Sequence, residues 1–418
     1  MAMSQKINRR NILISTGLAG AGVVLGGGGG YAIAQTQGQR TMQHNEANII
    51  PFYGSQQSGI VTPQQNHLHF AAFDLITENR DDIATLLKIW TATAATMASG
   101  KPIGEGTFPE HAAPPDTGEA LGLQASNLTI TFGLGPTLFT KDGKDRYGLA
   151  SRRPEALVDL PPMAGDALKE ERSGGDLCVQ ACSDNPLVAF HAIRNLARQA
   201  RGLAVMRWSQ LGFNRTASTS KKQETPRNLM GFKDGTNNLK IEDPELMKQH
   251  VWVGDEGLSW MHGGSYLVAR RIRMHLESWD RDFLADQEKV FGRRKVSGAP
   301  FNGKEEFDAV DLNAKHPDGT PMIATQAHIR LAAEDTSIKI LRRGYSFTDG
   351  MDITTGEQDA GLFFIAFNRD PRKQFIPLQT KLGQQDLLNE YITHNGSAIF
   401  ACPPGTHEGG FIGEALFA

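Results

Sequence analysis

The strongest constraint on the fold of this 418-residue chain is an order of predicted elements that occurs twice. Alternating apolar and polar residues predict strands, and apolar residues at helical spacing predict helices. Both halves show the order β-α-β-β-α-β, which predicts two ferredoxin-like α+β units with antiparallel sheets. The predicted elements of the first half are strands at 67–76, 127–135, 176–184 and 203–213 and helices at 79–98 and 185–200. Those of the second half are strands at 264–276, 340–347, 361–367 and 396–404 and helices at 280–292 and over most of 370–392.

Long connections separate several of these elements. Long irregular loops in a compact protein are usually functional, so the candidate site is expected in them. The connections are the segments 99–126, 136–175, 214–263 and 293–339. The repeat places the boundary between the two halves near residue 215, which gives an N-terminal half at 61–215 and a C-terminal half at 216–418.

The N-terminus has the composition of an export signal. Arg9 and Arg10 precede an apolar stretch of small residues, which ends in an A-x-A pattern at Ala34. This order predicts a twin-arginine signal peptide over 1–34 and a periplasmic or cell-envelope location. An ordinary secretory signal and an uncleaved membrane anchor are the alternatives.

A stable membrane span is not predicted. The glycine run at 26–30 is weakly helical and weakly hydrophobic. No other run reaches the ~18 apolar residues that a span needs. Residues 35–60 are polar and are predicted to be loosely ordered. Because the twin-arginine route carries proteins that fold before export, often around a cofactor, a bound prosthetic group is expected.

Charge and cysteine content exclude two classes of function. A net charge of −3 and a pI near 6.5 provide no basic face for a nucleic-acid partner. The three cysteines, Cys178, Cys182 and Cys402, show neither a CxxC pattern nor zinc-site spacing. Cys178 and Cys182 share one face of a predicted strand but are too far apart to bridge easily, so they are predicted to be core residues.

One acid lies on a glycine-rich turn in the connection 214–263. In GFKDGTNN, Asp234 is flanked by Gly231 and Gly235, which can adopt backbone angles that other residues avoid. Such a turn can bring a carboxylate close to a flat ligand. A plain Asx-type turn is the alternative.

A histidine and an arginine pair complete the candidate set. In TQAHIRLAAED, His328 and Arg330 alternate with apolar residues, and an imidazole beside a guanidinium suits a ligand that combines a metal with anionic groups, such as haem. In ILRRGYSF, Arg342 and Arg343 enter a strand, so one is expected to face a buried site and the other solvent. Solvated loop and edge residues are the alternative for all of them.

Together these motifs make the chain similar to the dye-decolourising peroxidases. The family signature GxxDG corresponds to 231–235, the proximal histidine segment to HIR at 328–330, and the following arginine to Arg342. The resemblance is closest to the exported deferrochelatase/peroxidase branch, which is associated with bacterial ferrous-iron uptake. It runs from about residue 50 to the C-terminus. The segments that carry it are IPFYGSQQSGIVTPQQ, ETPRNLMGFKDGTNN, VWV, GGSYLVARRI, FGR, SGAP, HIRLA and LRRGYSF.

The resemblance implies non-covalent haem b in the C-terminal half of a barrel-like pair of ferredoxin-like units. Noncovalent binding agrees with the lack of a CxxCH motif. It implies that His328 ligates the iron, that Arg330 contacts a propionate, and that Asp386 holds the far nitrogen of the histidine and so increases its electron donation. The implied catalytic residues are Asp234 and Arg342. The implied haem-binding residues are Gly235, Thr236, Asn237, His328, Arg330, Ala333, Glu334, Asp335 and Arg342.

The implied activity is reduction of hydrogen peroxide with one-electron oxidation of a donor. Asp234 would move a proton between the two peroxide oxygens, and Arg342 would stabilise the developing negative charge. A free Asp titrates near ~3.9 and a His near ~6.5, so an acidic optimum is expected. Two rival functions remain. Release of iron from haem with the protoporphyrin left intact is supported only through the resemblance, and non-catalytic haem carriage would need His328 but not the pairing of Asp234 with Arg342. A homodimer and a ferrous-iron uptake system are the expected partners.

Overall fold

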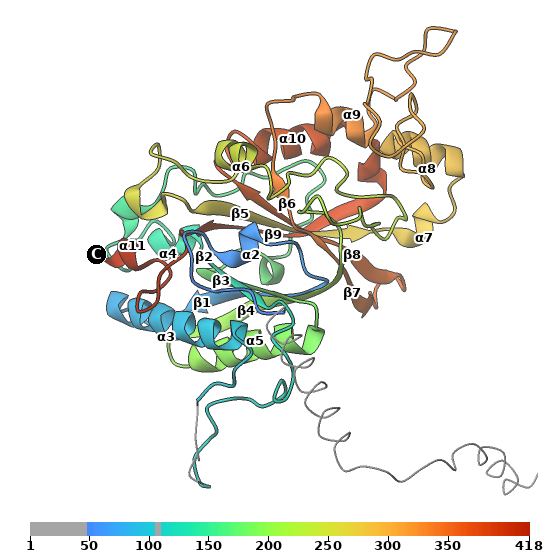
Figure 1. Ribbon diagram of the computed structural model, residues 1–418. Helices are drawn as coiled ribbons and strands as arrows, with labels where there is room; N and C mark the ends of the chain where they lie inside the picture. Colours follow the sequence, from blue (N-terminus) through green and yellow to red (C-terminus); the bar gives the residue numbers. More distant parts are fainter. Residues whose placement is uncertain (1–47, 105–109) are drawn as a thin grey trace, which may run out of the picture. The chain divides into compact units, whose positions relative to one another are not determined.

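The computed structural model describes residues 48–104 and 110–418, and residues 48–418 form one compact unit (Figure 1). The predicted signal peptide at 1–34 lies outside the described residues, as does the first half of the segment 35–60. The second half, 48–60, is not loosely ordered as predicted, because Phe52, Gln57 and Ile60 are buried against the rest of the chain. No helix in the described part of the chain combines the length and the apolarity needed to cross a membrane.

Nine strands form one sheet that closes on itself. The strand order is β5-β9-β2-β3-β1-β4-β7-β8-β6, and β5 also pairs with β8, so every strand except β6 belongs to a closed ring. All pairings between these strands are antiparallel. The strands are β1 (His67–Leu75), β2 (Thr129–Leu134), β3 (Leu177–Ser183), β4 (Ala204–Arg215), β5 (Ser265–Met274), β6 (Leu341–Arg342), β7 (Tyr345–Met351), β8 (Gln358–Asn368) and β9 (Ile392–Cys402).

The ring consists of two four-stranded sheets with the same topology. The first has the order β4-β1-β3-β2 and the second the order β7-β8-β5-β9, which is the ferredoxin-like arrangement in both. The two sheets meet at narrow joints. Only Leu134 and Ala401 pair between β2 and β9, and two residue pairs join β4 to β7. The predicted α+β fold with two antiparallel ferredoxin-like sheets is confirmed.

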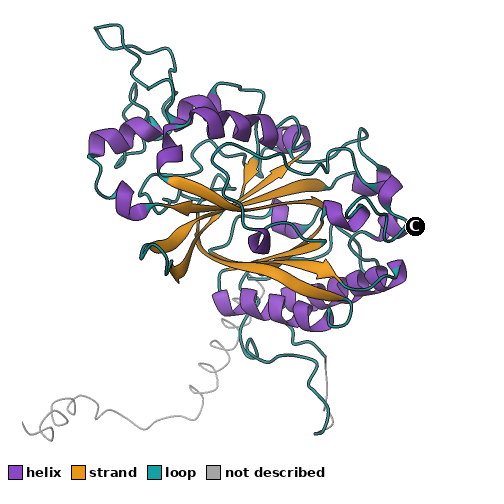
Figure 2. Ribbon diagram, turned by 180° about the vertical axis from the view of Figure 1, so that it is seen from behind, coloured by secondary structure: helices purple, strands orange, loops and turns teal. Residues whose placement is uncertain are grey.

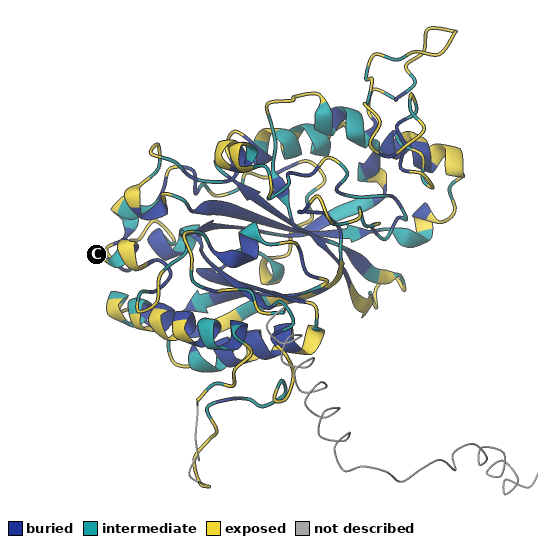
Figure 3. Ribbon diagram, viewed as in Figure 1, coloured by how far each residue is buried: buried dark blue, intermediate teal, exposed yellow. Residues whose placement is uncertain are grey.

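Two long helices cover the outer face of the first sheet. They are α3 (Arg80–Ala98) and α5 (Pro186–Gln199), which run side by side in Figure 2. Each begins at an asparagine whose side chain accepts a hydrogen bond from the backbone two residues on, at 3.0 Å for Asn79 and 2.9 Å for Asn185. Their inner faces are buried and their outer faces exposed (Figure 3).

Several predicted helices are shorter than the sequence suggests. The predicted helix at 280–292 begins only at Leu284, and it ends before Gly292, which takes the left-handed conformation (φ +81°) as a glycine at this position predicts. The predicted helix at 370–392 is helical only from Phe375 to Gln385 and then continues as a 3₁₀ turn.

The α-helices other than α3 and α5 are short. They are α2 (Ser58–Val61), α4 (Pro136–Phe139), α6 (Pro244–His250), α7 (Leu276–Trp279), α8 (Leu284–Phe291), α9 (His328–Ala333), α10 (Phe375–Gln385) and α11 (Glu414–Phe417). The 3₁₀ helices are η1 (Ala150–Arg152), η2 (Glu170–Arg172), η3 (Ser259–Met261) and η4 (Leu387–Glu390).

Strands β1, β2, β3 and β5 are buried on both faces, whereas much of β4 and the second half of β7 are exposed. Along β1, Ala71 and Phe73 belong to the core beneath the helices, whereas Phe70 and Ala72 belong to a second core that includes residues of β8 and β9. Phe70 packs against Trp208 at a ring distance of 5.3 Å. The second core therefore fills the space between the two sheets with side chains. The three cysteines are buried and form no disulfide, as predicted.

Candidate active site

The loop that carries Asp234 is held in shape by an asparagine that the sequence did not single out. Asn228 Oδ1 accepts hydrogen bonds from the backbone of Met230 at 3.1 Å and of Phe232 at 3.3 Å. Its Nδ2 lies 3.4 Å from Asp234 Oδ2. The Asp234 amide donates to Pro226 O at 2.9 Å, and Gly231 takes a positive φ of 85°. The Asx turn here is therefore formed by Asn228, and the Asp234 carboxylate is available for other contacts.

Asp234 forms an ion pair with Arg342. Arg342 Nη1 donates to Asp234 Oδ1 at 2.8 Å. The Arg342 side chain is 27% exposed to solvent and the Asp234 side chain 15%. The Arg342 backbone is fixed by Asn238, whose Oδ1 accepts from Arg342 N at 2.9 Å and whose Nδ2 donates to Arg342 O at 2.9 Å. The last asparagine of GFKDGTNN thus joins the acid-bearing loop to β6.

Arg343 does not face solvent, so that expectation is wrong. The two arginines do point to opposite sides of the chain, but protein lies on both sides. The Arg343 side chain is completely buried and donates to Thr62 O at 2.5 Å and to Gln65 Oε1 at 3.3 Å. Its backbone amide donates to Ile365 O at 2.8 Å, which keeps the residue against β8.

His328 begins the short helix α9 and is oriented by a buried carboxylate. Its Nδ1 lies 2.6 Å from Asp386 Oδ2, while Asp386 Oδ1 accepts from the Leu388 amide at 2.9 Å. The segment HIRLA is helical, although apolar and polar residues alternate in its sequence. Asp386 lies at the junction of α10 and η4, where its backbone ends one helix and its side chain caps the next.

The Asp234–Arg342 pair and the His328–Asp386 pair are close enough to interact electrostatically. Burial lowers the pKa of His328, but the charge and the hydrogen bond of Asp386 outweigh it and raise the pKa above its ordinary value. The charges of Asp234 and Arg342 also act on this imidazole. Although protein surrounds His328 closely enough for burial to affect it, 30% of its side chain remains accessible, so the ring borders open space.

The donor set fits a haem that would be held through one histidine. Nδ1 of His328 is engaged by Asp386, whereas Nε2 has no hydrogen-bond partner among the described residues. A histidine with a carboxylate on its far nitrogen is the usual form of a metal ligand in proteins. Within residues 48–104 and 110–418, no group of three or more His, Cys, Asp or Glu side chains could hold a metal ion. A single histidine with a free Nε2 suits one bond to the metal of a prosthetic group.

The predicted haem-edge residues of the loop have mixed surroundings. Gly235 has a φ of +91°, and a Cβ added there would lie 2.9 Å from Ala217 Cα, so the loop passes too close to the neighbouring chain for a side chain. Thr236 Oγ1 donates to Glu306 Oε1 at 3.0 Å, and Asn237 is exposed. Their predicted contact with haem stays a prediction.

The predicted residues after His328 have partners away from the two ion pairs. Arg330 donates to the backbone oxygens of Leu312 and Ile323, and half-buried Ala333 ends α9. Glu334 forms an exposed ion pair with Lys381, and Asp335 accepts from Ser337. The structure thus brings together Asp234, Arg342, His328 and Asp386, but it directs Glu334 and Asp335 to other contacts. A haem contact by Arg330, Ala333, Glu334 or Asp335 remains a prediction.

Glu306 holds the acid-bearing loop and was not found from the sequence. The Glu306 side chain is 8% exposed and forms an ion pair with Lys233. It also accepts a hydrogen bond from Thr236, so it binds the loop on both sides of Asp234. These contacts, together with a hydrogen bond from Thr225, outweigh burial and lower the pKa of Glu306. Nothing in its local sequence, KEEFD, marks Glu306 apart from its neighbours.

Comparison with known proteins finds relatives that match over most of the chain. Residues 57–214 match the family model described as Dyp-type peroxidase, N-terminal, and residues 225–407 match its C-terminal counterpart. The chain is 38% identical to a dye-decolorizing peroxidase of Thermobifida fusca over 377 residues, covering 86% of this chain and 83% of that protein. It is 36% identical to a deferrochelatase of Escherichia coli over 376 residues, covering 88% and 86%.

Solved structures show the same fold. Ferric DtpA from Streptomyces lividans superimposes with a TM-score of 0.80 at 38% identity and covers 90% of this chain and 99% of its own. A DyP-type peroxidase from Streptomyces coelicolor gives a TM-score of 0.81 at 39% identity, covering 89% and 98%.

Proposed function

Since this chain belongs to the Dyp-type peroxidase family, we propose that it is a haem peroxidase that reduces hydrogen peroxide and oxidises donors in one-electron steps. The observation that carries the proposal is that two ion pairs lie near each other: the charges of Asp234 and Arg342 act on His328, and Phe291 packs against both His328 and Phe232 of the acid-bearing loop. Asp234 and Arg342 supply an acid–base group and a cation, and His328 with Asp386 supplies an oriented metal ligand.

The cofactor that these residues fit is non-covalent haem b, whose iron would be held by His328 Nε2. When bound, haem supplies an iron that reacts with peroxide and accepts oxidising equivalents. Asp386 keeps the His328 proton on Nδ1 and leaves Nε2 free to bind metal. The negative charge of Asp386 also makes the imidazole a stronger electron donor.

Asp234 is placed to move a proton. Its Oδ1 accepts from Arg342 and its Oδ2 lies near Asn228, so the carboxylate has one fixed orientation. We assign it the transfer of a proton from one peroxide oxygen to the other, which is general acid–base catalysis. The second oxygen, now carrying both protons, would leave as water when the O–O bond breaks, and the haem would supply the two electrons of this reduction.

Arg342 is placed to stabilise negative charge on the departing oxygen. Only its Nη1 is engaged by Asp234, and its backbone is fixed at both N and O by Asn238. Donors that are fixed before the reaction stabilise developing charge without reorganisation. The pairing also keeps Asp234 and Arg342 on the same side of the site.

Iron release from haem is the second candidate, because relatives at 36% identity carry the name deferrochelatase. This reaction would leave protoporphyrin intact and would not require the Asp234–Arg342 pair. Non-catalytic haem carriage is the third candidate and would require only His328.

One experiment separates the three. The chain is loaded with haem and treated with hydrogen peroxide and a phenolic donor, and both donor oxidation and tetrapyrrole products are measured. Donor oxidation that greatly exceeds the rate with free haem supports the peroxidase. Metal-free protoporphyrin formed in proportion to released iron supports the deferrochelatase, and neither product supports the carrier.

We propose that the protein acts in the periplasm or cell envelope, with a homodimer as its assembly and a ferrous-iron uptake system as a partner. The paired arginines Arg9 and Arg10 support twin-arginine export. Replacing both by lysine should leave the full-length protein in the cytoplasm, and undiminished export of this variant would contradict the route.

A further inference from the structure

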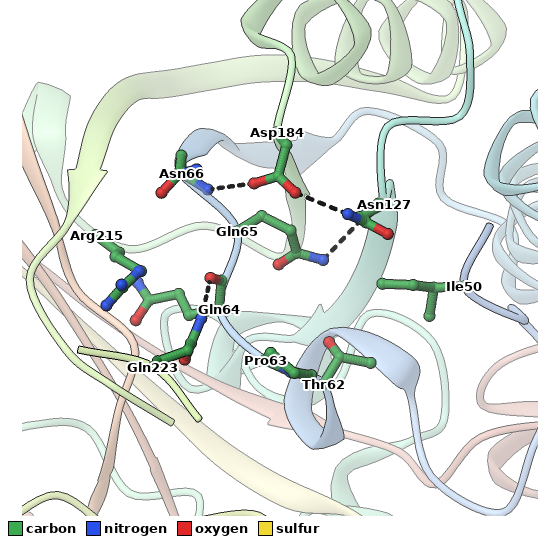
Figure 4. Close-up of a pocket in the computed structure, with 10 residues that line it drawn as sticks. All are labelled: Ile50, Thr62, Pro63, Gln64, Gln65, Asn66, Asn127, Asp184, Arg215 and Gln223. Carbon is green, nitrogen blue, oxygen red and sulfur yellow. Dashed lines mark hydrogen bonds between the residues drawn. The ribbon is translucent and has the colours of Figure 1, made fainter. Parts of the chain in front are cut away.

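A cavity of about 420 Å³ lies where the strands of the first sheet end, on the side where β1 and β2 begin and β3 and β4 finish (Figure 4). Its volume is within the range of small-molecule sites. Neither Asp234 nor His328 nor Arg342 lines it, so it is separate from the proposed peroxidase site. The lining residues are Ile50, Thr62, Pro63, Gln64, Gln65, Asn66, Asn127, Asp184, Arg215 and Gln223.

A buried cation lies directly behind the wall of this cavity. The Arg343 side chain is fully buried, and its guanidinium donates to Thr62 O and Gln65 Oε1, both of which belong to lining residues. In the described part of the chain, no carboxylate forms an ion pair with it, and its Nε has no hydrogen-bond partner. A buried charge without a counter-charge is costly, so an anion nearby would stabilise this arrangement.

A second arginine, Arg215, lines the cavity and has unused hydrogen-bond donors. Arg215 uses Nη1 for the backbone oxygens of Glu224 at 2.9 Å and Ala217 at 3.4 Å. Its Nε and Nη2 donate to none of the described residues, and this edge of a guanidinium binds carboxylates through two parallel hydrogen bonds.

Gln64 contributes a buried acceptor that lacks a donor. The residue is 2% exposed, and its Nε2 donates to Gly344 O at 2.7 Å. Its Oε1 is buried and has no partner among the described residues. A hydroxyl group of a ligand would satisfy this oxygen.

The one carboxylate of the cavity does not neutralise the two arginines. Asp184 is exposed, so water screens its charge. Both of its oxygens are already occupied, Oδ1 by the Asn66 amide at 3.0 Å and Oδ2 by Asn127 Nδ2 at 2.8 Å, as Figure 4 shows. The cavity therefore keeps a net positive character.

We propose that this cavity binds a small organic carboxylate that carries hydroxyl groups. The carboxylate takes the free edge of Arg215 and balances the charge of Arg343, and a hydroxyl donates to Gln64 Oε1. A bare inorganic anion would leave most of the volume to water and Gln64 Oε1 unsatisfied. The proposal does not depend on the peroxidase reaction, because the two sites share no residue.

The test is calorimetric titration of the haem-loaded protein with gluconate, with sorbitol and sulfate as controls. Sorbitol has the same carbon chain and hydroxyl groups without the carboxylate, and sulfate has charge without the carbon chain. We expect saturable binding of gluconate, at least tenfold weaker binding of sulfate, and none of sorbitol. Gluconate that fails to bind, or that binds no better than either control, would overturn the proposal.

Variants locate the binding in this cavity. Arg215→Gln and Gln64→Glu should each weaken gluconate binding at least tenfold, the first by removing the bidentate donor and the second by adding a like charge. Arg201→Gln, at an exposed arginine before β4, is the matched control and should bind like the wild type. Arg342→Leu should also bind gluconate normally. Loss of binding in Arg342→Leu with retention in Arg215→Gln would place the ligand in the peroxidase site and refute the assignment.

Discussion

The Arg342 guanidinium donates to the Asp234 carboxylate at 2.8 Å, although 108 positions separate the two residues. Asn238 makes this contact possible, because its side chain binds the backbone of Arg342 on both sides while its own backbone belongs to the loop that carries Asp234. The ion pair is therefore fixed from both loops, and its two groups can act on one small substrate.

Replacing Arg342 by leucine should slow the reaction with peroxide by roughly 10²–10³-fold, the usual effect of removing a fixed donor to developing charge. Arg342→Lys should recover only part of the rate, because a lysine cannot bind Asp234 and substrate through a planar fork. Stopped-flow absorbance of haem-loaded protein measures the rate. Arg369→Leu, which removes an exposed ion pair with Glu256, is the control that should react normally.

Asp386→Asn should keep haem bound but lower the rate with peroxide by roughly 10–100-fold. The amide oxygen can still cap the Leu388 amide, so the fold is preserved, whereas the charge next to His328 Nδ1 is lost. The absorption spectrum of the resting protein should shift as well. Asp318→Asn, which alters a cap at an exposed turn, should change neither quantity.

The ion pair of Glu306 should stabilise the protein at neutral pH and lose this effect in acid. The folded state lowers the pKa of Glu306 from 4.5, so the stabilisation is present above the unfolded value and disappears as pH falls through the folded value. The free energy of unfolding of Glu306→Gln, measured with urea, should therefore be below that of the wild type at pH 7 and approach it in acid. A constant difference at every pH would show that the charge is not responsible.

His69 should make the fold less stable as the medium becomes acidic. Burial lowers its pKa from 6.5 to about 4, so the unfolded chain binds a proton more readily than the folded chain between these values. Stability should fall with decreasing pH across this window, by at most about 3 kcal/mol for this one residue. In His69→Gln, which cannot titrate, urea unfolding should give a smaller decrease between pH 6.5 and pH 4. An equal decrease in both proteins would assign the effect to other groups.

Much of the fold could be predicted because its periodic segments pack with their expected faces. The strand at 67–76 and the helices at 79–98 and 185–200 match β1, α3 and α5 within a residue or two. Errors arose where local pattern and tertiary packing disagree. The predicted strand at 340–347 is interrupted between β6 and β7, at the point where Arg343 is buried under Thr62 and Gln65.

The central residues of the site could be inferred, but their supporting residues could not. Asp234, His328 and Arg342 lie in recognisable motifs, and Asp386 was reached through the resemblance. Asn238 contacts a residue 104 positions away and Glu306 one 70 positions away. A local sequence pattern cannot predict which residues so far apart in the chain will touch. The burial of Arg343 was missed for the same reason, since alternation along a strand does not reveal what covers its second face.

The most direct test of the central claim is the rate constant for hydrogen peroxide with haem-loaded wild type and Asp234→Asn, measured side by side. The claim is that Asp234, beside Arg342, moves the proton at a haem that His328 holds. It predicts a fall of roughly 10²–10⁴-fold in Asp234→Asn with an unchanged spectrum of the resting protein. Equal rate constants in the two proteins would contradict it.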